Sequence, residues 1–170
     1  PTRFYVSPDN GASFNSIAAG YPAGVITGLA ADGANVYLSV LAYAGTNTGI
    51  YRSTNGGLAW TLLTNGLPSP ILPGVLLANG ANVVVGLLTG PLYRSTDSGA
   101  SWSAVQLPVT MTGYDSALAV GATMYVSDNG VILRSTNSGA AWTVLARLDT
   151  ATIESLSFSG NLLYAATADS

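Results

Sequence analysis

An eight-residue segment rich in Ser and Gly occurs four times in this chain of 170 residues. The copies occupy residues 7–14, 53–60, 95–102 and 135–142, and the third copy reads Ser-Thr-Asp-Ser-Gly-Ala-Ser-Trp. Their first serines are separated by 46, 42 and 40 residues. Self-similarity at a period of about 42 residues is typical of a propeller blade or a solenoid repeat. The repeat therefore constrains the architecture before any single residue does.

Short apolar runs broken by Gly, Pro and Asn indicate an all-β chain, and no helical period extends over any length. Each full unit holds four runs, and the third and fourth runs flank the repeated segment. The expected strands are 25–31, 35–43, 49–53 and 59–63, then 71–78, 82–88, 91–95 and 101–107, then 114–120, 122–127, 131–135 and 141–148, and finally 153–159 and 160–166.

The last unit holds only two strands, and the missing pair matches a hairpin expected over residues 1–20. Joining the two ends keeps the period at 42 residues. The sequence therefore predicts a β-propeller of four-stranded antiparallel blades, four per chain, with one blade closed by the N- and C-terminal strands. The blades are expected at about 22–68, 69–108, 109–150, and 151–170 plus 1–21. An eight-bladed homodimer and a fragment of a longer propeller are the alternatives.

Charged residues are scarce, since they make up 8% of the chain against about 25% in ordinary globular proteins. The net charge is −3 and there is no histidine, which argues against nucleic-acid binding and excludes Ser–His–Asp chemistry. The chain has no cysteine and no apolar run that would span a bilayer. We expect no cofactor, no metal and no membrane insertion. We also expect self-association through a neutral surface and an extracellular or periplasmic location.

The pattern Ser-x-Asp-x-Gly-x-x-Trp, placed between third and fourth strands, resembles the Asp-box or BNR repeat of sialidase-like β-propellers. Two copies carry Asn55 and Asn137 where that family has Asp, and the first copy carries Phe14 in place of Trp. The resemblance covers the whole chain and implies the propeller fold. It does not imply one function, because sialidases, xyloglucan-degrading hydrolases, sortilin-type receptors and photosystem assembly factors share the repeat.

In that family the Asp-box is a structural turn remote from the active site. The residues here support the same role, because Asp or Asn accepts backbone N–H bonds within a turn and Gly permits unusual dihedral angles. A metal site shared by Asp9 and Asp97 is the alternative, but two blades separate these carboxylates. The expected turn residues are Ser7, Asp9, Gly11, Phe14, Ser53, Asn55, Gly57, Trp60, Ser95, Asp97, Gly99, Trp102, Ser135, Asn137, Gly139 and Trp142.

A glycoside hydrolase needs two carboxylates, and the resembling enzymes hold substrate on the face opposite the repeated turns. Glu154, the sole glutamate, begins a first strand, and Tyr114 and Asp115 occupy the equivalent place one blade earlier. These three residues are the catalytic candidates, and the alternative is that they are solvated residues at strand starts.

Arginine is the other residue type that a sialidase-like site would use, because resembling sialidases bind the substrate carboxylate with three arginines. Here Arg52, Arg94 and Arg134 share one repeating position beside the turn. We therefore expect a structural role for them.

The candidate ligand-binding residues come from loops on the face opposite the repeated turns. They are Tyr43, Asn47, Asp128, Asn129 and Arg147. We expect a non-catalytic binding or scaffold propeller that recognises a glycan or a protein there. The alternatives are a sialidase-like glycoside hydrolase and a purely structural repeat protein, natural or engineered, without a ligand.

Overall fold

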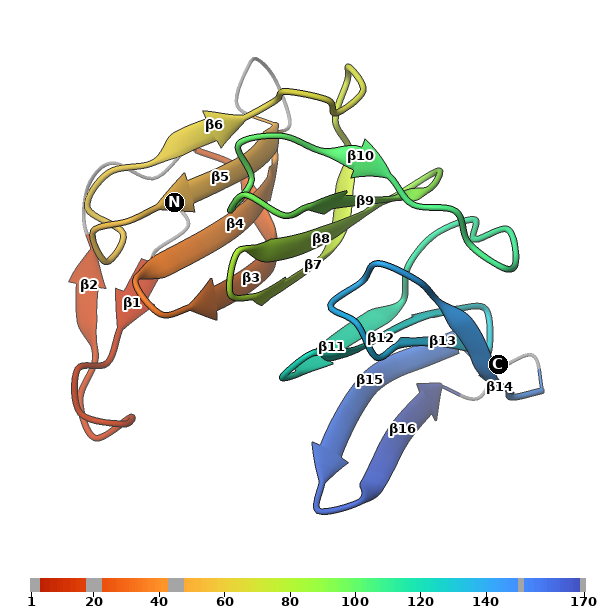
Figure 1. The fold of residues 1–170 in the computed structure, drawn as a ribbon. Coiled ribbons are helices and arrows are strands. Elements are labelled where there is room, and N and C mark those ends of the chain that lie inside the picture. Colours follow the sequence, from red (N-terminus) through yellow and green to blue (C-terminus); the bar gives the residue numbers. More distant parts are fainter. Residues whose placement is uncertain (1–3, 18–22, 43–47, 150–151, 169–170) are drawn as a thin grey trace.

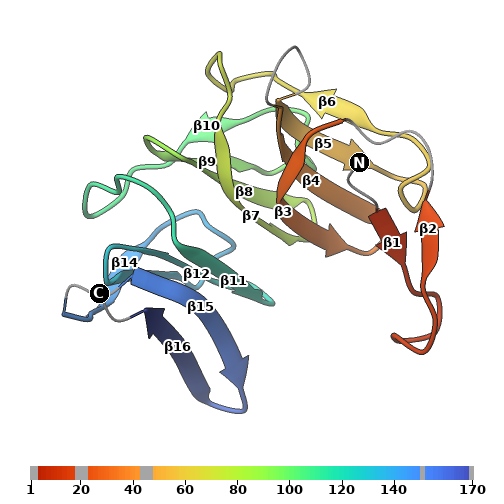
Figure 2. The same cartoon turned by 180° about the vertical axis from the view of Figure 1, so that it is seen from behind.

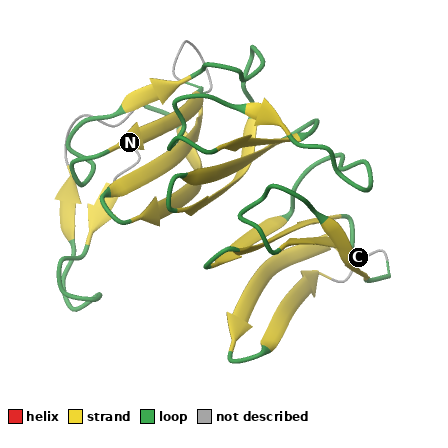
Figure 3. Ribbon diagram, in the orientation of Figure 1, coloured by secondary structure: helices red, strands yellow, loops and turns green. Residues whose placement is uncertain are grey.

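The computed structural model describes residues 4–17, 23–42, 48–149 and 152–168, and these ranges form strands and no helix (Figure 3). Three sheets of four antiparallel strands follow one another along the chain and are called blades 1, 2 and 3 (Figure 1). Blade 1 contains β3 (Val25–Asp32), β4 (Asn35–Leu41), β5 (Gly49–Ser53) and β6 (Thr61–Leu63). Blade 2 contains β7 (Pro73–Asn79), β8 (Asn82–Leu87), β9 (Leu92–Ser95) and β10 (Ser103–Ala104). Blade 3 contains β11 (Ser116–Val120), β12 (Thr123–Asp128), β13 (Val131–Ser135) and β14 (Thr143–Arg147).

Two further hairpins lie at the ends of this series. β1 (Phe4–Val6) pairs with β2 (Asn15–Ile17), and β15 (Thr152–Ser159) pairs with β16 (Leu162–Ala168). The sequence analysis joins these hairpins into one blade, whereas in the structure they form separate two-stranded sheets. They lie at opposite ends of an open arc because blades 1 to 3 stand between them (Figure 2).

The blades are stacked side by side through their apolar faces. The first strand of each blade contacts the first strand of the next, so that β3 meets β7, β7 meets β11 and β11 meets β15. On β8, Val83 and Val85 join the core shared with blade 1, while Val84 joins the core shared with blade 3. Successive strand residues point to opposite faces, so a strand between two blades has to be apolar on both. The prediction of an all-β chain with four antiparallel strands per blade is confirmed.

Each repeated segment folds into a tight turn closed by its first serine. In blade 2 the Ser95 hydroxyl accepts the N–H groups of Gly99 at 2.7 Å and Asp97 at 3.2 Å, and it donates to the Asp97 carboxylate at 2.7 Å. Ser98 and Gly99 have φ angles of 58° and 89°, a backbone region that favours glycine. The other three copies make the same serine bonds.

The choice of Asp or Asn in the turn is linked to the residue four positions later. Asp97 accepts the N–H and the hydroxyl of Ser101 on its two oxygens, at 2.8 and 2.6 Å, and Asp9 does the same with Ser13. The two Asn copies carry alanine at that position, so only the backbone N–H is bonded. Among the four turns, Asp is therefore found only where a serine hydroxyl donates to its second carboxylate oxygen.

Substitution of Ser95 tests how much one turn contributes to stability. The serine is buried, and Ser95→Ala leaves the N–H of Gly99 without its acceptor. We expect the free energy of unfolding to fall by about 1–3 kcal/mol. Urea denaturation measures it, with the exposed neighbour Thr96→Ala as the control. Equal effects of the two substitutions would contradict the assignment.

The carboxylate of Asp97 makes the turn sensitive to acid. Bonds from Ser101, and then from Ser95, lower the pKa of Asp97 to about 2 from its ordinary 3.8. A lowered folded-state pKa gives stability that is present above pH about 4 and lost as the pH falls toward 2. In Asp97→Asn, this part of the acid-induced loss should vanish in urea titrations between these pH values, while the exposed control Asp149→Asn retains it. An unchanged pH profile would refute this origin.

Candidate functional site

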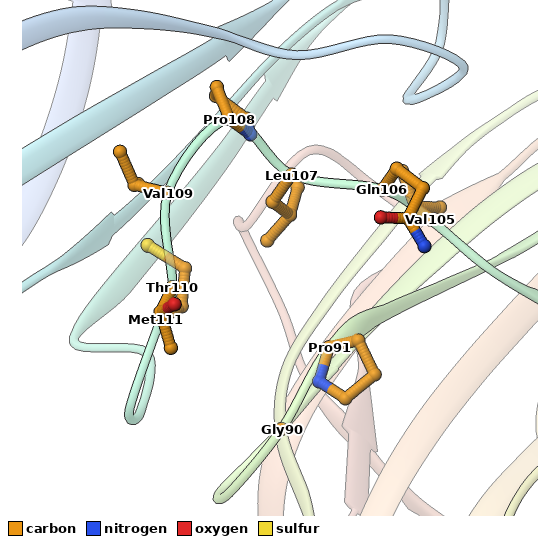
Figure 4. Close-up of a pocket in the computed structure, with 9 residues that line it drawn as sticks. All are labelled: Gly90, Pro91, Val105, Gln106, Leu107, Pro108, Val109, Thr110 and Met111. Carbon is orange, nitrogen blue, oxygen red and sulfur yellow. The ribbon is translucent and has the colours of Figure 1, made fainter.

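A groove opens between blades 2 and 3, beside the loop that joins the second strand of blade 2 to its third. Gly90 and Pro91, which precede β9, line one side, and residues 105–111 of the link to blade 3 line the other (Figure 4). Its volume is about 430 Å³, within the range of sites that bind small molecules or short segments. It lies at the opposite end of the strands from the repeated turns.

The lining of this groove is uncharged and mostly apolar. Figure 4 shows Leu107 projecting from the link toward Pro91, with Met111 at one end and Gln106 at the other. Gln106 and Thr110 are the polar side chains among the lining residues. The arrangement offers apolar contact and a few neutral hydrogen bonds, and it supplies no acid, base or nucleophile at this place.

A similar groove lies one blade earlier. It has a volume of about 390 Å³ and is lined by Thr48, Leu62, Thr64, Leu67, Pro68, Ser69, Pro70 and Ile71. Both grooves contain a Leu-Pro pair, Leu67-Pro68 and Leu107-Pro108, at the point where the chain leaves one blade for the next. A groove with a Leu-Pro pair is thus found at two junctions between blades.

Tyr114, a predicted catalytic residue, lies buried under the groove between blades 2 and 3. Its hydroxyl donates to the carbonyl of Gly90 at 3.1 Å. Its ring lies against Gly86 so closely that a Cβ on that glycine would overlap it. Burial, followed by the charge of Asp128, raises the pKa of Tyr114. These contacts give Tyr114 a packing role and keep its proton in place at neutral pH.

Asp128, a predicted ligand-binding residue, is buried and holds the link to blade 3. Its Oδ2 accepts the N–H groups of Thr112 at 2.5 Å and Gly113 at 3.2 Å, and Oδ1 accepts the side-chain amide of Asn129 at 2.7 Å. The carboxylate is therefore occupied by groups of its own chain.

The remaining catalytic candidates lie next to this cluster. Asp115 accepts the N–H of Asn129 at 2.9 Å and that of Ile153, at the start of β15, at 3.4 Å. Glu154 follows Ile153 and is exposed. The structure thus brings the start of β15 to Asp115 and engages the Asp115 carboxylate with backbone N–H groups.

The other predicted residues fall outside the groove. Arg147 is exposed at the end of β14, and Tyr43 and Asn47 lie outside the described residues. Two of the three repeating arginines join blades, because Arg52 donates to the carbonyl of Ser98 and Arg94 to the corresponding carbonyl of blade 3, each at 2.8 Å, whereas Arg134 is exposed. This supports the structural role predicted for them.

Within residues 4–17, 23–42, 48–149 and 152–168, no group of three or more His, Cys, Asp or Glu side chains is placed to hold a metal ion. The same ranges contain no helix of the length and hydropathy that a membrane span requires.

Comparison with known proteins places the fold. No protein-family model matches the chain. A xyloglucanase of Hypocrea jecorina (strain QM6a) is 32% identical over 139 residues, which are 76% of this chain and 16% of that protein. The chain therefore spans about a sixth of the length of this relative.

Solved structures of low identity share the architecture. The extracellular domain of the putative hybrid two-component system BT4673 from B. thetaiotaomicron matches 98% of this chain and 24% of its own, with a TM-score of 0.71 and 20% identity. A structure described as YCF48 bound to D1 peptide matches 97% of this chain and 54% of its own, with a TM-score of 0.68 and 13% identity. Both are β-propellers. Together with the strand order, they establish that this chain has a β-propeller fold, as predicted.

The groove residues were not among those predicted from sequence. Pro91, Leu107 and Val109 carry no ionisable or nucleophilic group, so nothing in their chemistry marks them as functional residues in the sequence. The available signal was the Leu-Pro pair recurring 40 residues apart, directly after a fourth strand.

Removal of the Asp128 side chain tests its assigned role. Asp128→Ala leaves the N–H groups of Thr112 and Gly113 without an acceptor, and each such loss costs about 1–3 kcal/mol of the free energy of unfolding. Denaturation in urea measures the loss. The exposed Asp149→Ala is the matched control and should change stability by less than about 0.5 kcal/mol. If Asp128→Ala were as stable as the control, Asp128 would not be holding the link.

Proposed function

We propose that this chain is a non-catalytic binding module whose groove between blades 2 and 3 receives an uncharged segment of a partner protein. The observation that carries the proposal is the lining of the groove, which is neutral, has no ionisable side chain and consists mainly of apolar side chains beside Gln106 and Thr110. A charged ligand would lose its hydration there without gaining an opposite charge. An apolar segment would bury its own surface and that of Leu107. The structural neighbour described as YCF48 bound to D1 peptide gives peptide binding a precedent on this fold.

The repeated turns fit a structural role away from this groove. We infer that they are Asp-boxes, which the bonds of Ser95 and Asp97 and the buried Trp102 support. Their serine, Asp and Asn side chains bond within the turn itself, and the groove lies at the opposite end of the strands.

Glycoside hydrolysis is the second candidate, and the 32% identity with a xyloglucanase favours it. The reaction would need Glu154 and Asp115 as a pair of carboxylates about 5–9.5 Å apart. Asp115 already accepts two backbone N–H groups, so its carboxylate is engaged by the chain's own backbone. A xyloglucan chain is also a neutral ligand, so carbohydrate binding without turnover is a further form of the same proposal.

Binding measurements with Leu107→Asp test the proposed groove. Short uncharged peptides on an array, and xyloglucan oligosaccharides, are the probes, and titration calorimetry gives the Kd of the best binder. A carboxylate in the groove should weaken that binding at least tenfold, which is about 1.4 kcal/mol. Leu58→Asp places the same charge on an exposed leucine of a repeated turn and should leave the Kd unchanged.

Two outcomes would contradict the proposal. If Leu58→Asp weakened binding as much as Leu107→Asp, the groove would not be the site. If aryl glycosides or xyloglucan were cleaved, and Glu154→Gln abolished the cleavage, the chain would be a hydrolase and not a binding module.

A further inference from the structure

The hairpins at the two ends of the arc are complementary halves of one blade. Gly160, between β15 and β16, has a φ of 59°, and Gly33, Gly80 and Gly121 have φ angles of 57°, 58° and 58° between the first and second strands of blades 1 to 3. β1 and β2 flank a repeated turn, as third and fourth strands do. Among the described strands, β16 pairs only with β15 and β1 only with β2. Each hairpin therefore presents a free edge to a partner strand.

A contact that joins blades 1 and 2 has its equivalent divided between the two ends of the arc, where both residues are exposed. Tyr37 on β4 and Leu76 on β7 belong to one core cluster and are 0% and 6% exposed. Their counterparts by position in the repeat are Tyr164 on β16 and Leu29 on β3. These are 53% and 59% exposed. Each lacks the partner that its counterpart has.

A second contact is divided in the same way. Leu63 on β6 and Trp102 in the following turn share the same cluster and are 6% and 5% exposed. At the end of blade 3, Ala146 lies opposite Ile132 as Leu63 lies opposite Ile50, and the adjacent Leu145, in the bulge of β14, is 40% exposed. Phe14, the counterpart of Trp102 in the first turn, is 64% exposed. The exposed apolar side chains thus fall at or next to positions where the repeat buries a contact between blades.

The hydrogen bond between blades is also incomplete at the end of blade 3. Arg52 and Arg94 each donate to a carbonyl in the turn of the following blade, which for Arg94 is the carbonyl of Ser138. Arg134 holds the same position in blade 3 and is exposed. The corresponding turn residue is Asn10, whose φ of 56° matches the 54° of Ser138.

We propose that a second copy of this chain completes both half-blades. β16 of one copy pairs with β1 of the other, and two such junctions close a ring of eight blades, four from each copy, with two-fold symmetry. The register follows from blade 3, where Val126 on β12 lies opposite Leu133 on β13. Transferred to the junction, it places Ala165 opposite Tyr5. Phe14 then packs against β14 at the end of blade 3, and Tyr164 covers Leu29.

The arc itself favours two copies. β16 and β1 of one chain lie at opposite ends of the arc and are not paired, so the arc is open (Figure 1). Three copies would give about twelve blades, beyond the usual range of about 4–8. The arc also superposes over 97% of its length on 54% of the YCF48 propeller chain, so its curvature fits inside a ring of about twice its length.

Light scattering and cysteine pairing test the junction on this 170-residue chain, which has no cysteine of its own. We expect a molar mass twice the 17.2 kDa of one chain. With Tyr5→Cys and Ala165→Cys in every copy, mild oxidation should give covalent dimers on a non-reducing gel, because directly opposed Cα atoms lie within disulfide range. The pair Val6→Cys and Ala165→Cys is one residue out of register, points to opposite faces and should not link.

A matched pair of variants tests the apolar contact. Tyr164→Asn should raise the dissociation constant of the dimer at least tenfold. Leu162→Asn, two residues away on β16, should leave it unchanged, because blades 1 and 2 carry Asn35 and Asn82 at this position. A single-chain mass, a disulfide that closes within one chain, or equal linking by the out-of-register pair would overturn the proposal.

Discussion

Burial of the apolar faces of the blades is the constraint on which the rest of this structure depends. A four-stranded sheet of this kind has no polar face, since Val83, Val84 and Val85 on β8 point alternately into two different cores. Each of the three blades packs between two neighbouring sheets, and the first strands contact one another in succession. This packing also explains why arginine, in a chain with so few charges, is placed where it bonds to the next blade.

Much of the fold could be predicted from sequence because the repeat encodes it locally. The turn around Ser95 needs a hydroxyl, an acceptor and a glycine at fixed offsets, and these residue types can be recognised in the sequence alone. Its spacing gives the blade, and the apolar runs give the strands. Closure is different, because the pairing of β16 with β1 depends on how far successive blades rotate. That rotation arises from packing between blades, and no sequence motif specifies it.

The candidate site could be predicted only in part. Tyr114, Asp115 and Asp128 are candidate site residues in the sequence because they carry functional groups, and the structure brings them to one junction. What sequence could not show is that Asp128 and Asp115 are occupied by backbone N–H groups and that Tyr114 is buried against Gly86. The groove is made by Pro91 and Leu107, which look like ordinary loop residues until the link is placed above them.

The packing beneath the groove has a thermodynamic consequence. Tyr114 fixes the loop at Gly90 from below, Asp128 holds the link at Thr112, and proline restricts the backbone on both sides of the hollow. A ligand segment that binds in the groove contacts a backbone that these bonds already hold in place. The protein therefore loses little conformational entropy on association. Affinity then depends on how well the ligand itself tolerates being fixed, and a short, stiff ligand gains most from such a surface.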